Sequence, residues 1–75
     1  MSNSGLSECG RRLRAGREGL GLSQAALAMK VGVDQSALHR WEAGEREPNL
    51  AKRHLLACVL GSDPYAIEQP AEAAS

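Results

Sequence analysis

The chain has 75 residues, with nine Lys/Arg balanced by nine Asp/Glu, so its formal net charge is zero. This length supports one small domain and excludes an enclosed substrate pocket, and the balanced charge counts against indiscriminate binding to nucleic acid. Few β-branched residues and abundant Ala, Leu, Arg and Glu favour an all-α fold. We expect a single domain over residues 1–75, with an ordered core of about residues 6–69 between short flexible ends.

Charge is distributed unevenly along this balanced chain. Residues 1–40 contain six Lys/Arg and three Asp/Glu, whereas residues 41–75 contain three Lys/Arg and six Asp/Glu. A basic first half would orient the molecule on a polyanion, with modest affinity and strong salt dependence. No apolar run approaches the roughly 20 residues of a membrane span and no cleavable signal is visible, so we expect a cytoplasmic protein with no membrane partner.

Two helices are predicted in the first third of the chain. From Leu6 to Leu20, apolar or small residues recur every three or four positions, which is helical period. This helix should end in the stretch 19–21, where glycine supplies a left-handed terminus. Ser23 is a suitable N-cap for a second helix from Gln24 to about Lys30.

A tight turn at residues 31–33 leads to a third predicted helix. Asp34 is expected to cap it, and it runs from Gln35 to about Glu42. Ala28 is small where the axes of the second and third helices must approach each other. The apolar residues spaced to bury the inner side of this helical pair are Leu27, Val31, Val33, Leu38 and Trp41. The third helix is therefore predicted to project outward as a rod that fits a major groove.

Two further helices are predicted in the acidic half. Asn49 caps the fourth helix and Gly61 ends it. The apolar residues of this helix that we expect to face inward are Leu50, Leu55, Leu56, Val59 and Leu60. Asp63-Pro64 then predicts a short fifth helix, to which Tyr65 and Ile67 contribute apolar side chains. The sequence thus predicts five helices, no strand and no internal repeat.

Residue types that carry out chemistry are present but not in catalytic arrangements. Cys9 and Cys58 lie far apart among apolar positions, which predicts buried free thiols; a disulfide or a redox switch is the alternative. His54 has no ligand partner at metal spacing, and no oxyanion loop or phosphate-cradling glycine loop occurs. We therefore expect no enzyme activity, no metal or other cofactor, and no small-molecule ligand.

Leu13 to Gly61, about two thirds of the chain, contains a specific set of matching residues. They are Arg17, Gly21-Leu22-Ser23-Gln24, Leu27-Ala28, Val31-Gly32-Val33, Trp41-Glu42-Ala43-Gly44 and Pro48. In this set the chain resembles the phage repressor/Cro-like, or XRE, family of helix-turn-helix DNA-binding proteins. The resemblance implies a compact five-helix, lambda-repressor-like domain in which Arg17 forms a structural ion pair with Glu42. It also implies that the third helix contacts bases through Gln35, Ser36 and Arg40.

The chemistry of the third helix agrees with this implication. With Leu38 and Trp41 facing inward, its outward face carries Gln35, Ser36, His39 and Arg40. Gln pairs bidentately with adenine, Arg pairs with guanine, and Ser takes either role. The candidates for phosphate contact are Ser23, Gln24, His39 and Arg46. For each of these residues the alternative is a solvated or capping side chain.

For some basic residues the sequence allows two roles. The loop after the third helix is often basic in the family, whereas here Arg46 lies between Glu45 and Glu47. Clamping of the DNA backbone by this loop is therefore an open question. Lys52 and Arg53 are either further phosphate contacts or solvated helix charges.

The favoured function is a sequence-specific double-stranded DNA-binding transcriptional regulator. We expect a repressor that binds an inverted-repeat operator as a homodimer, because one recognition helix contacts only about 4–5 base pairs. The dimer interface is expected to include Tyr65 and Ile67. The alternative is an antitoxin-like or anti-regulator subunit that uses the motif to dock another protein, which the zero net charge favours. The operator, the sign of regulation and the genetic context stay open.

Overall fold

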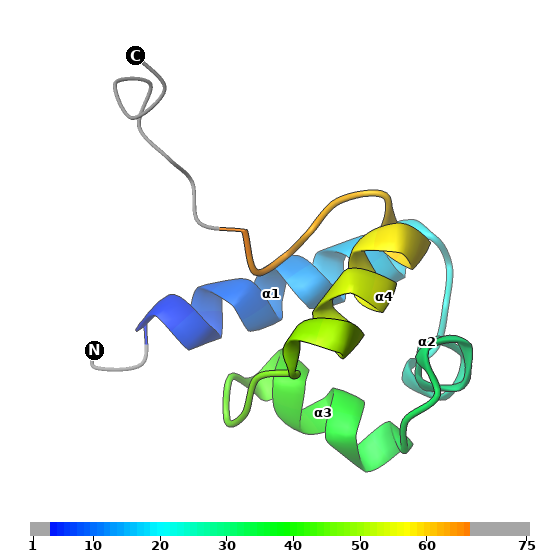
Figure 1. Cartoon of the computed structure of the whole chain (residues 1–75), viewed down its shortest axis with the longest axis horizontal. Helices are drawn as coiled ribbons and strands as arrows, with labels where there is room; N and C mark the ends of the chain where they lie inside the picture. The colour runs from blue at the N-terminus through cyan, green and yellow to red at the C-terminus, as the bar shows by residue number, and fades with distance from the viewer. Residues whose placement is uncertain (1–3, 67–75) are drawn as a thin grey trace.

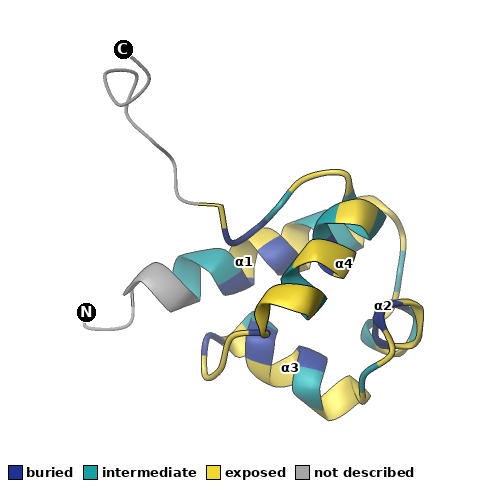
Figure 2. Ribbon diagram, in the orientation of Figure 1, coloured by how far each residue is buried: buried dark blue, intermediate teal, exposed yellow. Residues whose placement is uncertain are grey.

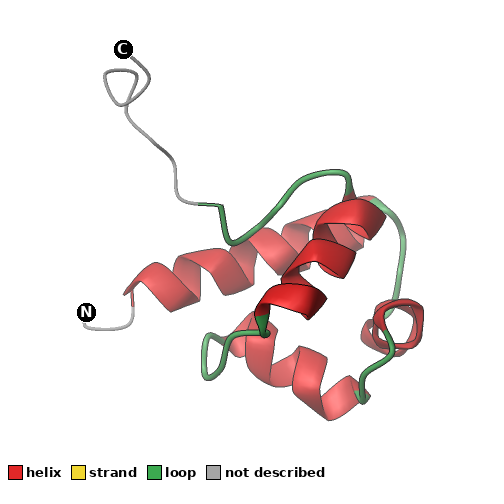
Figure 3. Ribbon diagram, viewed as in Figure 1, coloured by secondary structure: helices red, strands yellow, loops and turns green. Residues whose placement is uncertain are grey.

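In the computed structural model, which describes residues 4–66, these residues form four helices and no strand. They are α1 (Ser4–Gly19), α2 (Gln24–Val31), α3 (Gln35–Ala43) and α4 (Leu50–Leu60). Helix α1 packs on α3, and α2 packs on both α3 and α4 (Figure 1). The predicted all-α class is confirmed over this range (Figure 3). None of these four helices is both long and apolar enough to cross a membrane.

Short-range signals define the helix ends largely as predicted. The side-chain oxygens of Ser23 and Asn49 accept hydrogen bonds from the N–H groups of Ala26 and Lys52, at 3.0 and 2.9 Å, and so cap α2 and α4. Asp34 occupies the N-cap position of α3, as predicted, although its carboxylate accepts no capping hydrogen bond. Its charge still lies at the positive end of the α3 dipole.

The hydrophobic core lies where the four helices meet (Figure 2). Its buried residues are Leu13, Leu27, Ala28, Val31, Leu38, Trp41, Leu56 and Tyr65. Burial of a leucine-sized side chain stabilises a fold by about 1.5–3 kcal/mol, so these residues are the main source of stability in a domain of this size. The inward positions predicted for Leu38 and Trp41 are confirmed.

Helix α4 buries less of its surface than its sequence suggested. Leu50 and Leu55 are 62% and 42% exposed, so the prediction that they face inward is wrong. Leu56 is fully buried, and a helix turns about 100° per residue, so one narrow face of α4 meets the core. Cys58 is also exposed, which corrects the prediction of a buried thiol there. Cys9 is half-buried, and both thiols are free.

The predicted fifth helix is not confirmed. Within the described residues the chain after α4 forms turns, in which the Asp63 side chain accepts the N–H of Tyr65 at 2.9 Å. This short-range hydrogen bond supports a turn instead of capping a helix. The Tyr65 ring is buried against the core, and burial raises the pKa of its phenol above the ordinary value. Ile67 lies outside the described residues.

Gly10 marks a close approach between α1 and α3 that the sequence did not reveal. A Cβ atom at this position would clash with the backbone carbonyl of Glu42 and lie 2.8 Å from that of Trp41. We expect Gly10→Ala to lower the free energy of unfolding by about 1–3 kcal/mol, because backbone atoms cannot move aside without displacing α3. Urea unfolding followed by circular dichroism measures this loss.

The matched control lies at the end of the same helix. A Cβ at Gly19 would meet nothing within 4 Å, so Gly19→Ala should cause no comparable loss. If the Gly10 and Gly19 variants were equally stable, α1 and α3 would not be in the contact described.

Candidate nucleic-acid interface

Helix α3 turns one face to the core and the other to solvent. Leu38 and Trp41 are 0% and 7% exposed. The polar residues Gln35, Ser36, His39 and Arg40 are all exposed. They share one side of a nine-residue helix about 13 Å long. The outward face predicted from the sequence is therefore present, while contact of its side chains with bases stays a prediction.

The turn between α2 and α3 fixes the direction in which this face points. Gly32 adopts the left-handed conformation, with φ 75°, which residues with a Cβ rarely adopt. The N–H of Val33 donates to the carbonyl of Ala28 at 2.9 Å, which closes the end of α2. Ala28 itself is 2% exposed. The sequence prediction of a tight turn beside a small, buried residue is confirmed.

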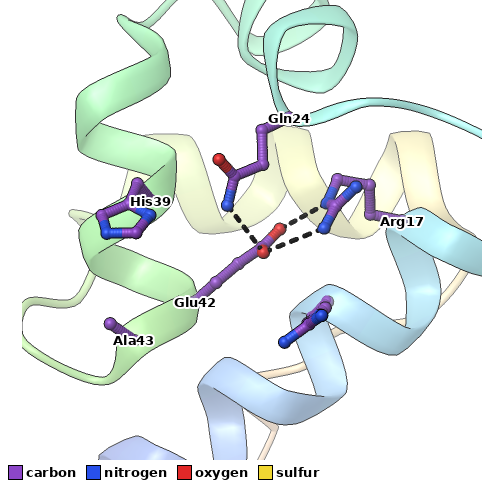
Figure 4. A pocket seen from close by; sticks show the side chains of 6 residues that line it. Arg17, Gln24, His39, Glu42 and Ala43 are labelled. Carbon is purple, nitrogen blue, oxygen red and sulfur yellow. Dashed lines mark hydrogen bonds and ion pairs between the residues drawn. The ribbon is translucent and has the colours of Figure 1, made fainter.

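The side chains of Arg17 and Glu42 connect α1 to the end of α3 (Figure 4). Arg17 Nε and Nη2 donate to the two carboxylate oxygens of Glu42, at 2.6 and 3.1 Å. The side chains of Arg17 and Glu42 are only 11% and 5% exposed. Hydrogen bonding to Glu42 raises the pKa of Arg17 above its ordinary value, although burial acts in the opposite direction. Arg17 therefore keeps its positive charge although both side chains are nearly removed from solvent.

Two further contacts extend this pair into a network. Arg17 Nη1 donates to the carbonyl of Leu22 at 2.8 Å, in the loop before α2. The amide nitrogen of Gln24 donates to Glu42 Oε1 at 3.0 Å (Figure 4). One carboxylate of α3 is thus held by α1 and by the first residue of α2. The sequence indicated the ion pair but not the part that Gln24 takes in it.

A surface recess surrounds this network. Its lining residues come from three helices and are Arg14, Arg17, Gln24, His39, Glu42 and Ala43. Two of the predicted phosphate contacts, Gln24 and His39, lie together here (Figure 4). Ser23 is not part of the lining, and its hydroxyl caps α2. Arg46 lies in a separate groove that Arg40 also lines.

Most of the other basic side chains have partners within the protein. On α1, Arg11 pairs with Glu8 and Arg14 with Glu18, and these are exposed pairs within one helix that contribute little to stability. On α4, Arg53 pairs with Asp63 at 3.4 Å and donates to the carbonyl of Tyr65 at 3.2 Å. These positive charges are locally compensated by nearby carboxylates, which the formal charges of the two halves did not reveal.

Lys52 and Arg46 differ in the contacts that they make. Lys52 Nζ donates to the carbonyl of Val31 at 3.1 Å. Arg46 is exposed, and the described part of the chain gives it no hydrogen bond or ion pair. Among the basic residues of the α3–α4 loop and of α4, Arg46 is thus the one whose geometry best suits a phosphate contact.

The residues predicted for a dimer interface are only partly described. Tyr65 is 5% exposed and packs in the core of its own chain, and Ile67 lies outside the described residues. Between residues 4 and 66, no three His, Cys, Asp or Glu side chains gather where they could hold a metal ion.

Two short helices joined by a left-handed turn, the second with a polar outward face, define a helix-turn-helix protein. Residues 13–67 match the HTH_3 helix-turn-helix family, so the chain belongs to that family. The resemblance drawn from the sequence is confirmed.

Two proteins illustrate the relationship. Repressor protein C2 of Salmonella phage P22 is 50% identical over 55 residues, which are 73% of this chain and 26% of that protein. The chain therefore spans about a quarter of the length of this curated relative. The restriction-modification controller protein C.AhdI of Aeromonas hydrophila, known from a crystal structure, is 39% identical. The match covers 79% of this chain and 89% of that one, with a TM-score of 0.72.

Proposed function

We propose that this protein is a transcriptional regulator that binds double-stranded DNA by inserting α3 into the major groove. The observation that carries the proposal is the exposed face of α3, which holds an amide, a hydroxyl and a guanidinium on a helix fixed by the Arg17–Glu42 pair. A rigid helix with such side chains can form hydrogen bonds to base edges. The names of the repressor and controller proteins that the chain resembles support this role.

Each polar residue has a definite part in this proposal. Gln35, Ser36 and Arg40 contact bases, with the Arg40 guanidinium placed against guanine N7 and O6. Phosphates on one side of the groove are bound at the recess that contains Gln24 and His39, where the first N–H groups of α2 also lack helical partners. In this arrangement Ser23 contributes mainly by capping α2.

The second phosphate region is the groove beside the α3–α4 loop. Arg46 and Arg40 both line it. A strand that runs past the end of α3 would meet Arg46 there while Arg40 turns to the base edges. The neighbouring Glu45 and Glu47 limit the affinity. Because Arg46 is exposed, its contribution is sensitive to salt.

The regulator acts as a homodimer on an inverted repeat. One α3 contacts about 4–5 base pairs, too few for a unique site, and a two-fold dimer doubles the sequence that is read. The C-terminal part of the chain provides the contact, with Ile67 as the predicted apolar residue. The outward Leu55 of α4, 42% exposed, offers a further apolar side chain in the same part. Repression follows when such a dimer covers a promoter.

The alternative is a subunit that uses the same motif to bind another protein, as an antitoxin or anti-regulator does. The observation in its favour is electrostatic: the net charge is zero, and arginines of α1 pair with glutamates of the same helix. Such a surface attracts a polyanion weakly.

Two experiments separate these functions: selection of duplexes from a random pool, and then fluorescence anisotropy with the selected duplex at about 50 and 200 mM salt. Counterion release changes affinity strongly over roughly this range of salt. We expect enrichment of an inverted repeat that binds two chains per duplex, more tightly at the lower salt. Absence of binding below about 10 μM at low salt would reject the DNA-binding function and favour the protein-docking one.

A further inference from the structure

Lys52 reaches from α4 to the end of α2, at the turn that leads into α3. Its Nζ donates to the carbonyl of Val31, the last residue of α2, at 3.1 Å. This carbonyl is one of the groups that a helix end leaves without an intrahelical partner. A Cβ placed on the next residue, Gly32, would lie 3.7 Å from the same Nζ atom. The ammonium therefore lies directly against the turn.

The position of this charge is unfavourable within its own helix. Asn49 caps α4 through the N–H of Lys52, which places Lys52 in the first turn, where the helix dipole disfavours a cation. The same ammonium lies at the C-terminal end of α2, where the dipole favours a cation. The contact between the two helices thus accounts for a charge that α4 alone would not stabilise.

We propose that Lys52 is a positioning residue that fastens the turn between α2 and α3 to α4, and so sets the orientation of the recognition helix. Lys52 also lines the groove that contains Arg40 and Arg46. Its ammonium, however, donates to the Val31 carbonyl, and in this proposal it acts through that contact and not through a phosphate. The effect on DNA rests on the proposed function, because the turn determines where α3 presents Arg40 only if α3 reads bases. The competing role is the one left open by the sequence, a phosphate contact.

The salt dependence of binding distinguishes the two roles. Lys52→Met retains most of the aliphatic stem but removes the donor, and we expect about a tenfold loss of affinity for the selected duplex, as for one charge-assisted hydrogen bond. Affinity for random duplex and the slope of log Kd against log salt should stay unchanged. A uniform loss on both duplexes, with a slope smaller by about 0.9 for each lost phosphate contact, would overturn the proposal.

A measurement without DNA tests the contact itself. The N–H groups of Gly32 and Val33 form the hydrogen bonds that close the end of α2. In Lys52→Met their hydrogen exchange should accelerate about tenfold relative to that of Leu13 in the core, because the turn opens locally. Lys52→Arg, which keeps the charge and a donor, should restore slow exchange. An unchanged ratio in Lys52→Met would overturn the proposal even if DNA binding were altered.

Lys30→Met is the matched control. Lys30 is exposed in the last turn of α2, so its replacement removes the same charge from the same helix end but leaves the Val31 contact in place. We expect normal exchange at Gly32 and Val33 in this variant, and acceleration equal to that in Lys52→Met would refute the assignment. If the wild-type protein has no sequence preference, the proposed function fails, and the exchange measurement alone decides the role of Lys52.

Discussion

Arg17→Met is expected to lower the free energy of unfolding by about 3–5 kcal/mol, a large share of the total for a domain of this size. The substitution leaves the Glu42 carboxylate, whose side chain is 5% exposed, without its cationic partner. The amide of Gln24 would be its remaining hydrogen-bond donor in the network. Chemical denaturation followed by circular dichroism measures the loss.

Two controls separate the buried pair from the effect of removing any arginine. Arg14→Met breaks an exposed pair with Glu18 on the same helix, where the side chains are 64% and 55% exposed, and should change stability by less than about 1 kcal/mol. Adding Glu42→Leu to Arg17→Met should recover much of the stability, because the cost comes from an unpaired buried charge. If Arg17→Met were no worse than Arg14→Met, the Arg17–Glu42 network would have no such role.

Arg40→Ala is expected to remove about 1–3 kcal/mol of discrimination between the selected duplex and random sequence in each half-site. The side chain is exposed and its backbone lies in a helix fixed on its opposite face, so the fold should remain intact. Competition anisotropy with both duplexes gives the specificity ratio directly. An unchanged ratio would exclude Arg40 from reading bases.

Arg46→Ala is the matched comparison for Arg40→Ala. Both residues are exposed arginines that line the same groove, but Arg46 lies in the loop after α3. We expect Arg46→Ala to weaken binding to both duplexes equally and to reduce the slope of log Kd against log salt by about 0.9 per protomer. If the two variants lost the same specificity, net charge and not the position on α3 would govern recognition.

The features that the sequence predicted well depend on short-range physics. Ser23 and Asn49 hydrogen-bond to N–H groups three residues ahead, so a capping residue and its helix can be identified together. Gly32 lies at a turn that demands the left-handed conformation, which few other residues adopt. The solvent-facing side of α3 follows from the buried positions of Leu38 and Trp41.

The features that were not predicted depend on contacts between distant parts of the chain. The sequence leaves Lys52 and Arg53 open between solvated charges and phosphate contacts. In the structure Lys52 contacts the end of α2, and Arg53 contacts Asp63 in the turn after α4. Leu55 is apolar at helical spacing, yet α4 meets the core along a face too narrow to include it. Helical periodicity identifies an apolar side without showing how much of it a small core can cover.

The single tryptophan of the chain gives the protein an intrinsic optical probe of its recognition helix. Trp41 belongs to α3, but its ring lies on the core side and is 7% exposed. Nucleotides bound at the outward face would not stack on this indole. Trp41 also lines the groove that contains Arg40 and Arg46. A change in its emission when a duplex is added would therefore report either a shift of α3 against the rest of the domain or DNA in that groove, and a change that persists in Arg46→Ala would assign it to the shift.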